Sequence, residues 1–467
     1  MKAPVLVALL LCASGARAGQ PPSQPPSSPQ PPLQPTTPPL TLVEPAAPAG
    51  APLLLTLQDA LERAKQNDQQ FQSAVADAEL AQEDRVQARA SLLPSFSYTT
   101  QFLGNSANGV NPNGRFVSLD GVQMYRSWAV VHQEISPNVL MRTPLRRTQA
   151  LEAAAQAKLE VAQRGLGVTV TRSYYALVVA QRKYATAQQG VQQAARFFQT
   201  TQEQERLGQV AHSDTIKAEI AFQQQQQAFR DALIAIDNAR LALAVLLFPV
   251  LNENFSVVDD LATVPPLPPF NDVRALAVQN NPDVRAADET LRAASQDVRA
   301  ARNAFLPSLV FDGIYGIEAN EYALHSRVVA QPELGVLPNL GYFVTVNLQV
   351  PIWDWGSLRS KLHQTETREH HAELTLTLTQ RQLMSNLYSM YNEALAARAA
   401  VDNLQHVADL AAESLRLISL RYQAGESTAF EVVDAQNTLV QARNAMDDAQ
   451  TRYRIALAEL QTLTGRF

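Results

Sequence analysis

Two carboxylates that follow a glycine in the last fifth of the chain are the residues best suited to chemistry. Gly425 interrupts a long helical pattern, and Glu431 and Asp434 follow it by six and nine residues. Carboxylates gathered at a narrow opening attract cations and repel one another. The segment could therefore gate one end of a tube. Alternatively, both acids face water at a helix N-terminus, where the helix dipole favours negative charge.

A second polar group lies on one predicted helix face. Its members recur at three- and four-residue steps, with His371 adjacent, and are His363, Glu366, His370 and Glu373. Two histidines and two glutamates could hold zinc, but an exposed polar helix face is far commoner, so we predict no metal. The sequence shows no nucleotide-phosphate loop, nucleophile elbow or Cys/His site. We therefore predict that the protein is not an enzyme and has no cofactor.

The elements that would position the acids are two long helical hairpins. Gly208 is followed by Asp214 six residues later, as Gly425 is followed by Glu431. Before Gly208, a proline-free helical pattern rich in Ala and Gln covers about 145–205, roughly 90 Å at 1.5 Å per residue. A second helix is predicted to return over about 213–248. Helices of this length indicate a coiled coil or bundle.

The chain is internally duplicated. Asp59 and Asn67 match Asp272 and Asn280 at an offset of 213, and the Leu-Pro-Ser segments that start at Leu93 and at Leu306 match at the same offset. Repeat 1 is predicted over 54–251, with strands at about 95–103 and 124–136 and a helical hairpin at about 145–248. Residues 252–269 form a Pro-rich connector. Repeat 2 is predicted over 270–467, with strands at about 309–317 and 341–350 and a hairpin at about 357–467.

The N-terminus has the pattern of a secretory signal peptide over 1–18, with Lys2, a short apolar core and a small-x-small cleavage site. A buried apolar helix is the alternative. Cleavage would change the net charge from −6 to −8, because Lys2 and Arg17 are lost. It would also remove Cys12, the single cysteine; Leu11 before it argues against lipidation. Residues 19–53 form a Pro-rich linker, and the absence of a basic block argues against nucleic acid.

The strand segments alternate apolar and polar residues, although His132 and Glu134 share a face with Trp128 and Val130. No predicted helix is long and apolar enough to cross a membrane, so a spanning structure would have to be a closed barrel. Four strands are too few to close a membrane barrel, so strands from other copies of the chain would have to join the same barrel. A soluble, half-buried antiparallel sheet shows the same alternation and is the alternative.

Over residues 54–467 the chain resembles the TolC-like outer-membrane factor family. The resemblance rests on the duplication, the glycine turns with downstream acids, the two Leu-Pro-Ser segments, and the strand exit Pro351-Ile-Trp-Asp-Trp-Gly356, which the first copy lacks. It implies a mostly helical homotrimer with a helical tunnel and four strands per chain in a shared twelve-stranded barrel in outer-membrane lipid. It also implies docking of a periplasmic adaptor and an inner-membrane transporter at the turns near Gly208 and Gly425.

The resemblance also implies roles for the residues at the turns. Glu431 and Asp434 match the acids of the tip aperture, so three chains would place six carboxylates there, some with raised pKa. Tyr422 matches a tyrosine that holds the closed tip by bonding an acid of the neighbouring hairpin, which is Asp214 here. Ser427 stands where a basic residue often strengthens this latch.

These observations predict a passive, gated exit duct of an efflux or type I secretion system in the cell outer membrane. The transporter selects the cargo, so drugs, metals, other small molecules and proteins all fit the sequence. The alternative, from another functional class, is a periplasmic coiled-coil scaffold with a soluble β-sheet.

Overall fold

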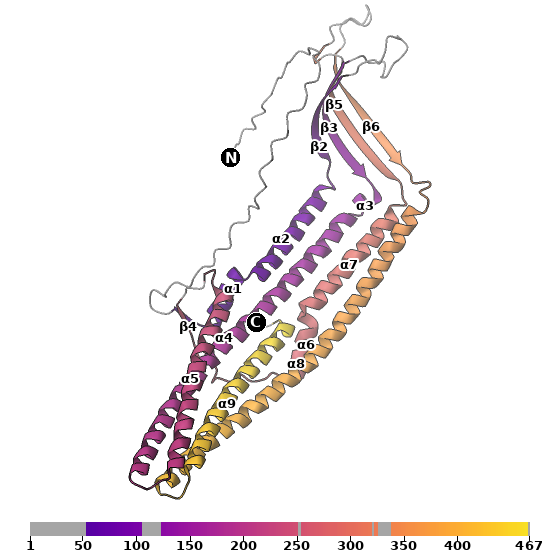
Figure 1. The fold of residues 1–467 in the computed structure, drawn as a ribbon. Helices are drawn as coiled ribbons and strands as arrows, with labels where there is room; N and C mark the ends of the chain where they lie inside the picture. Colours follow the sequence, from indigo (N-terminus) through magenta and orange to yellow (C-terminus); the bar gives the residue numbers. More distant parts are fainter. Residues whose placement is uncertain (1–52, 105–122, 251–253, 320–321, 326–337, 466–467) are drawn as a thin grey trace, which may run out of the picture. The chain divides into compact units, whose positions relative to one another are not determined.

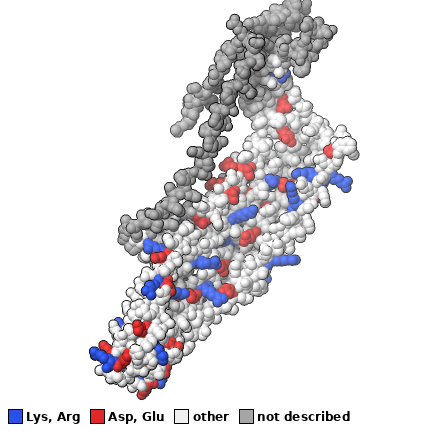
Figure 2. Space-filling view, in the orientation of Figure 1, with Lys and Arg blue, Asp and Glu red and all other residues white. Residues whose placement is uncertain are grey.

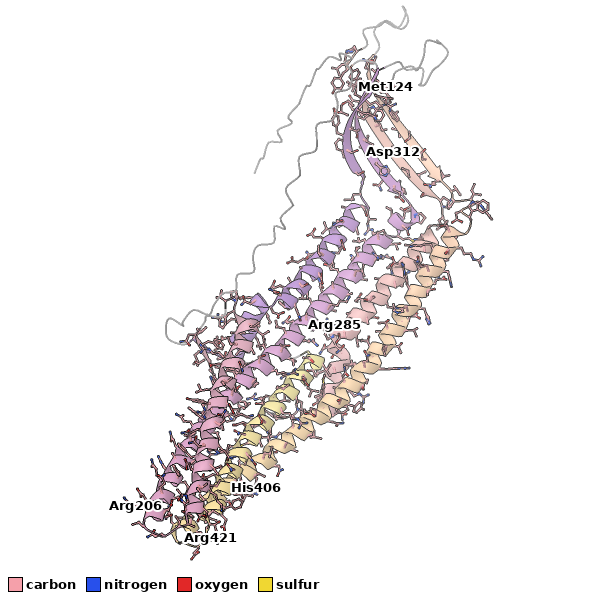
Figure 3. The ribbon with its side chains drawn as sticks, viewed as in Figure 1. Met124, Arg206, Arg285, Asp312, His406 and Arg421 are labelled. Atoms are coloured by element: carbon pink, nitrogen blue, oxygen red, sulfur yellow. The ribbon has the colours of Figure 1, made fainter. Side chains whose placement is uncertain are left out.

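The computed structural model describes residues 53–104, 123–250, 254–319, 322–325 and 338–465. The predicted signal peptide and most of the predicted linker lie outside these residues. Two long helical hairpins and a four-stranded sheet dominate the described part, and the sheet lies at the end of the helices opposite the hairpin turns (Figure 1). Figure 3 places Arg206 and Arg421 near the turns, and Met124 and Asp312 in the sheet. The mostly helical fold class with a small sheet is thereby confirmed.

The helices follow a similar order in the two halves of the chain, except that the short helix α3 has no counterpart among the described residues of the second half. The first half contains α1 (Leu57–Asn67), α2 (Gln69–Ala90), α3 (Pro137–Leu140), α4 (Thr143–Arg206) and α5 (His212–Leu247). The second half contains α6 (Phe270–Asn280), α7 (Pro282–Asn303), α8 (Ser357–Gln423) and α9 (Ala429–Thr464). None of the described helices carries a stretch that is both long and apolar enough to cross a membrane.

Short polar residues divide the helices that precede each sheet segment. Asp68 ends α1 and caps α2, since its carboxylate accepts a hydrogen bond from the Phe71 amide at 2.7 Å. Asn281 does the same between α6 and α7 for the Val284 amide at 3.0 Å, and Pro282 follows at the first helical position. A side chain that satisfies a free amide favours a new helix start, so the chain changes direction there without a long loop.

The main sheet is antiparallel and has the strand order β2-β3-β5-β6. Its strands are β2 (Ser95–Gly104), β3 (Gln123–Ile135), β5 (Ser308–Ala319) and β6 (Leu340–Gln349). The central β3–β5 pair joins the two halves of the chain, so β2 and β6 are the edges. One face is apolar and exposed in the single chain, as Phe96 (73%) and Tyr342 (81%) show.

The opposite face of the sheet carries the charged residues of β3 and β5. His132 Nδ1 lies 2.6 Å from Asp312 Oδ1, and Arg126 Nε lies 2.8 Å from Glu318 Oε1. The weak alternation in β3 thus arises because this strand places Trp128 beside polar groups on the polar face. The opposite-charge pair of Arg126 with Glu318 and the hydrogen bond between His132 and Asp312 stabilise that face locally.

A small parallel pair near the middle of the helices was not expected from the sequence. Strand β1 (Leu53–Leu55) pairs with β4 (Phe255–Val257), which lies within the segment interpreted as a Pro-rich connector. Tyr174 on α4 is 1% exposed beneath the pair, and its hydroxyl donates to the carbonyls of Leu55 (3.2 Å) and Val258 (2.7 Å). Strands of three residues are too short to show a period of two, so tertiary contacts decide their conformation.

Candidate functional site at the hairpin turns

The two hairpins turn through the same backbone motif. Gly208 and Gly425 have φ of +72° and +78°. Gln209 N donates to Gln204 O at 2.8 Å, and Glu426 N donates to Arg421 O at 2.9 Å. These bonds satisfy carbonyls left free at a helix end, and the left-handed residue between them favours glycine. Each glycine is therefore required by backbone geometry.

Glu431 lies in the first turn of α9 and takes part in a local hydrogen-bond group. Thr428 caps the helix, because its hydroxyl oxygen accepts from the Glu431 amide at 3.3 Å. The Ser427 hydroxyl donates to Glu431 Oε2 at 2.6 Å. This bond, chiefly, holds the pKa of Glu431 below its ordinary value. Within one chain the shift is therefore opposite to the raised pKa expected of a ring of carboxylates.

Asp434 follows one helical turn later and faces water. Its side chain is exposed and forms no hydrogen bond or ion pair within the described part of the chain. Residues three apart lie on one side of a helix, so Asp434 and Glu431 share a face. A single chain places two carboxylates side by side, and the ring of six remains a prediction.

Tyr422 connects the two turns. Only 9% of it is exposed, its ring meets that of Phe197 on α4 at 5.1 Å in an edge contact, and its hydroxyl donates to Gln204 Oε1 at 3.0 Å. Asp214 instead lies 4.0 Å from Lys217 in the first turn of α5. Within one chain, the tyrosine therefore bonds an amide of the first hairpin rather than the expected acid.

Gln204 and Phe197 did not stand out in the sequence. Both lie in the Ala- and Gln-rich stretch of α4, where a glutamine has no distinguishing local pattern. Phe197 packs against a buried patch of Tyr422, Ala429 and Val432, and Gln204 accepts the Tyr422 hydrogen bond. Gly208 and Gly425 are 217 positions apart, and the sequence around them matches at that offset. This match indicates that the two turns are equivalent, but it does not indicate that they touch.

An arginine further along α4 ties the hairpins together. Arg182 Nη1 donates to Asp447 Oδ1 (3.0 Å) and to Gln450 Oε1 (2.9 Å) on α9. Its Nε and Nη2 donate to the two carboxylate oxygens of Asp259, in the segment between the halves, at 2.6 and 2.8 Å. Burial raises the pKa of Asp447. One guanidinium thus holds α4, α9 and the connecting segment together, with fork geometry that only arginine provides.

The histidine-rich face of α8 is an exposed polar surface. His370 Nδ1 lies 3.3 Å from Glu373 Oε2, and Glu366 Oε1 accepts a hydrogen bond from Arg302 at 3.2 Å. In the part of the chain that the structure describes, no three His, Cys, Asp or Glu residues are placed to hold a metal ion.

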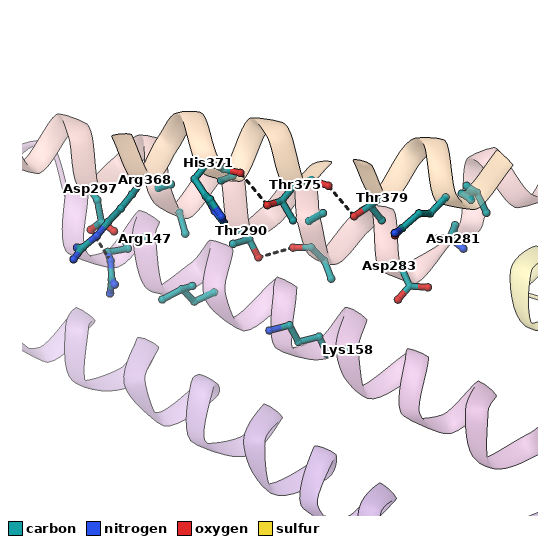
Figure 4. Close-up of a pocket in the computed structure, with 18 of the residues that line it drawn as sticks. Arg147, Lys158, Asn281, Asp283, Thr290, Asp297, Arg368, His371, Thr375 and Thr379 are labelled. Carbon is teal, nitrogen blue, oxygen red and sulfur yellow. Dashed lines mark hydrogen bonds and ion pairs between the residues drawn. The ribbon is translucent and has the colours of Figure 1, made fainter. Parts of the chain in front are cut away.

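A groove of about 770 Å³ follows α7 between α4 and α8. Small side chains of α7 form its floor, and Arg147 pairs with Asp297 at 2.7 Å at one end (Figure 4). Thr290, Thr375 and Thr379 donate to carbonyls of their own helices. Burial raises the pKa of Asp283 at the other end. Most of the lining thus consists of small side chains and of polar groups that bond within their own helices or to a neighbouring helix.

Comparisons with known proteins agree with this architecture. The family model described as outer membrane efflux protein matches residues 60–247 and 273–466. Alkaline protease secretion protein AprF of Pseudomonas aeruginosa is 23% identical over 88% of this chain and 84% of its own. Outer membrane protein TolC of Escherichia coli K12 is 22% identical over 88% and 82%. The crystal structure of the Campylobacter jejuni CmeC outer membrane channel superposes with a TM-score of 0.72 at 19% identity, over 88% of this chain and 85% of that one.

Proposed function

This chain belongs to the outer membrane efflux protein family, and we propose that it assembles as a homotrimeric exit duct gated at its hairpin turns. The family places it in the outer membrane, as a channel rather than an enzyme, and supports a role as the exit duct of a tripartite efflux or secretion system. The trimer, the gate and their residues are the parts that we propose.

The four-stranded sheet provides the main support for a trimer. Its apolar face is exposed in the single chain, and both edge strands, β2 and β6, lack a further partner strand among the described residues. The visible part of the sheet is also mostly uncharged, whereas the helices carry charges of both signs (Figure 2). Unpaired strand edges are too costly in lipid to persist, so β6 of one chain would pair with β2 of the next. Three chains would close twelve strands.

Paired cysteines test this arrangement directly. The only cysteine, Cys12, lies in the predicted signal peptide, so the mature chain would offer a cysteine-free background. Single cysteines at Ser97 or Thr99 on β2 would be combined with one at Thr345 or Asn347 on β6. Oxidation in outer membranes should give a ladder that ends at three chains. Each cysteine alone serves as the control, and a ladder absent from every combination would contradict the shared barrel.

The gate is supported by the arrangement of the turns. Tyr422 and Gln204 join the hairpins, and the carboxylates of Glu431 and Asp434 lie on one helix face beside the turn. With three chains around an axis, those acids would line the opening and make the closed pore selective for cations and sensitive to multivalent cations. Planar-bilayer recordings of Glu431→Ala combined with Asp434→Ala should show reduced cation selectivity. Unchanged selectivity would contradict the gate, and Glu413→Ala, an exposed acid higher on α8, is the control.

The relatives suggest the partners of the duct. We propose that a periplasmic adaptor docks near Gly208 and Gly425 and links the duct to an inner-membrane transporter, which would supply the energy and select the cargo. Co-purification of the native complex, followed by identification of the transporter, tests this and defines the cargo. The scaffold alternative predicts a monomer in the soluble periplasmic fraction, whereas the duct predicts a heat-modifiable trimer in detergent extracts of outer membranes.

A further inference from the structure

Two tryptophans are exposed where the sheet meets the helices. Trp353 and Trp355 follow the last residue of β6 by four and six positions and are 76% and 89% exposed, and their rings meet edge-on with centroids 5.7 Å apart. They lie in the segment that joins the sheet to α8. Tryptophan is the side chain most enriched where a membrane meets water, because its ring is apolar and its N–H can still donate a hydrogen bond.

The backbone at the second tryptophan and the following glycine has a left-handed conformation. Trp355 has φ of +58° and Gly356 has φ of +85°, and a positive φ is uncommon for a residue with a bulky side chain. The Asp354 carboxylate accepts hydrogen bonds from the amides of Gly356 (3.0 Å) and Leu358 (2.5 Å). These bonds hold the turn, and Asp354 forms no ion pair with a basic side chain within the described part of the chain.

Basic side chains lie at the sheet-side starts of both long helices. Arg142 and Arg146 stand at the start of α4, and Arg359 and Lys361 at the start of α8. All four are exposed, and none has a carboxylate partner within the described part of the chain; Lys361 Nζ contacts only the neutral Gln364 at 3.3 Å. Each lies within five residues of a helix start, about 7 Å along the axis. Figure 2 shows Lys and Arg side chains gathered at this end of the helices.

We propose that Trp353, Trp355, Arg142, Arg146, Arg359 and Lys361 form a collar that binds anionic phospholipid headgroups in the membrane leaflet facing the helices. The tryptophans would lie at headgroup level, and the long basic side chains would reach back to the phosphates. The headgroup region is a narrow layer at the edge of the hydrocarbon core, and the four cations follow the ends of β3 and β6 by 7 to 12 residues. The inference rests on the proposed insertion of the sheet in the outer membrane.

Lipid exchange in nanodiscs tests the collar. The full-length protein would be placed in discs of phosphatidylcholine and phosphatidylglycerol with identical acyl chains, extracted, and its retained lipid counted by mass spectrometry. The wild type should retain phosphatidylglycerol preferentially. Arg359→Gln combined with Lys361→Gln should lower that preference roughly tenfold or more, since each cation near an anionic surface contributes appreciably. Arg359→Lys should keep the preference, and Trp353→Ala combined with Trp355→Ala should lower retention of both lipids.

The control is Arg274→Gln, an exposed arginine on α6 away from the sheet, which should retain lipid as the wild type does. If the glutamine variants form trimers and retain phosphatidylglycerol as the wild type does, the collar is overturned. The proposed duct is then unaffected. Loss of the trimer in the tryptophan variant with unchanged lipid preference would also overturn it, and would assign the surface to a contact between chains. A protein that never enters the membrane fraction would overturn both the collar and the proposed duct.

Discussion

Arg182 on α4 lies 3.0 Å from Asp447 on α9, so one ion pair joins two hairpins whose residues are 265 positions apart. Asp447 is 5% exposed. If the arginine is removed, the carboxylate remains buried with no positive charge to compensate for its lost hydration. Removing one partner of a buried ion pair therefore usually lowers the free energy of unfolding by more than the pair itself contributes to it.

The first prediction follows from this pair. Arg182→Met should destabilise the folded chain by about 3 kcal/mol, because Asp447 would remain buried and unpaired. Thermal denaturation of the purified protein would measure the loss, and adding Asp447→Leu should recover part of it. Arg172→Met is the matched control, since its pair with Glu459 at 2.9 Å is more exposed and should contribute at most about 1 kcal/mol. Equal losses in the two variants would contradict the prediction.

The second prediction concerns the glycine at the turn. Gly425→Ala should cost about 1–2 kcal/mol, because φ of +78° is strained for alanine although nothing lies within 4 Å of the added Cβ. Hydrogen exchange of the peptides on either side of the turn should accelerate. Gly425→Asn should be milder, since asparagine tolerates this conformation. Gly165→Ala offers the control, since that residue also has free space but is helical, so alanine should be neutral or stabilising there.

The third prediction is a pH dependence at the start of α9. The Glu431 pKa is lowered in the folded chain, so its hydrogen bonds stabilise the turn above the ordinary glutamate pKa and are lost as pH falls through the lowered value. Hydrogen exchange of residues 427–434, corrected for intrinsic rates, should show protection that persists into mildly acidic solution.

Ser427→Ala should move that loss of protection to higher pH, because it removes the donor that chiefly lowers the Glu431 pKa. Ser213→Ala, at the matching turn of α5, is exposed and should leave the profile unchanged. An unaltered profile in the Ser427 variant would show that another group sets the pKa.

The fourth prediction separates two partners for Tyr422. If its bond to Gln204 holds the hairpins together, Tyr422→Phe and Gln204→Leu should raise the conductance of the closed pore to a similar extent, and each should cost about 1 kcal/mol. Tyr388→Phe, which alters a half-exposed tyrosine on α8, should have no effect. If Asp214→Asn reproduces the effect and Gln204→Leu does not, the family's tyrosine–acid latch forms between chains instead.

The sequence determined the features that depend on neighbouring residues. Gly208 and Gly425 mark the turns in the sequence. Each turn needs a residue with positive φ, and the preference of that conformation for glycine depends only on the local backbone. Uninterrupted runs of helix-forming residues predict the long helices. The order of the helical runs and glycine turns along the duplicated chain was sufficient to predict the family and the fold class. The roles assigned to Glu431, Asp434, Tyr422 and Asp214 remain predictions.

Only the tertiary structure decided which distant residues meet. The parallel β1–β4 pair, the bond from Tyr422 to Gln204 and the contacts of Arg182 with Asp259 and Asp447 join residues far apart in sequence. No local period encodes such contacts, because most of them depend on how helices of 36 to 67 residues, about 54 to 100 Å long at 1.5 Å per residue, align against one another. The same packing brings the segment after β3, with Arg142, and the segment after β6, with Trp353, to the sheet-side end of the helices, although they come from different halves of the chain.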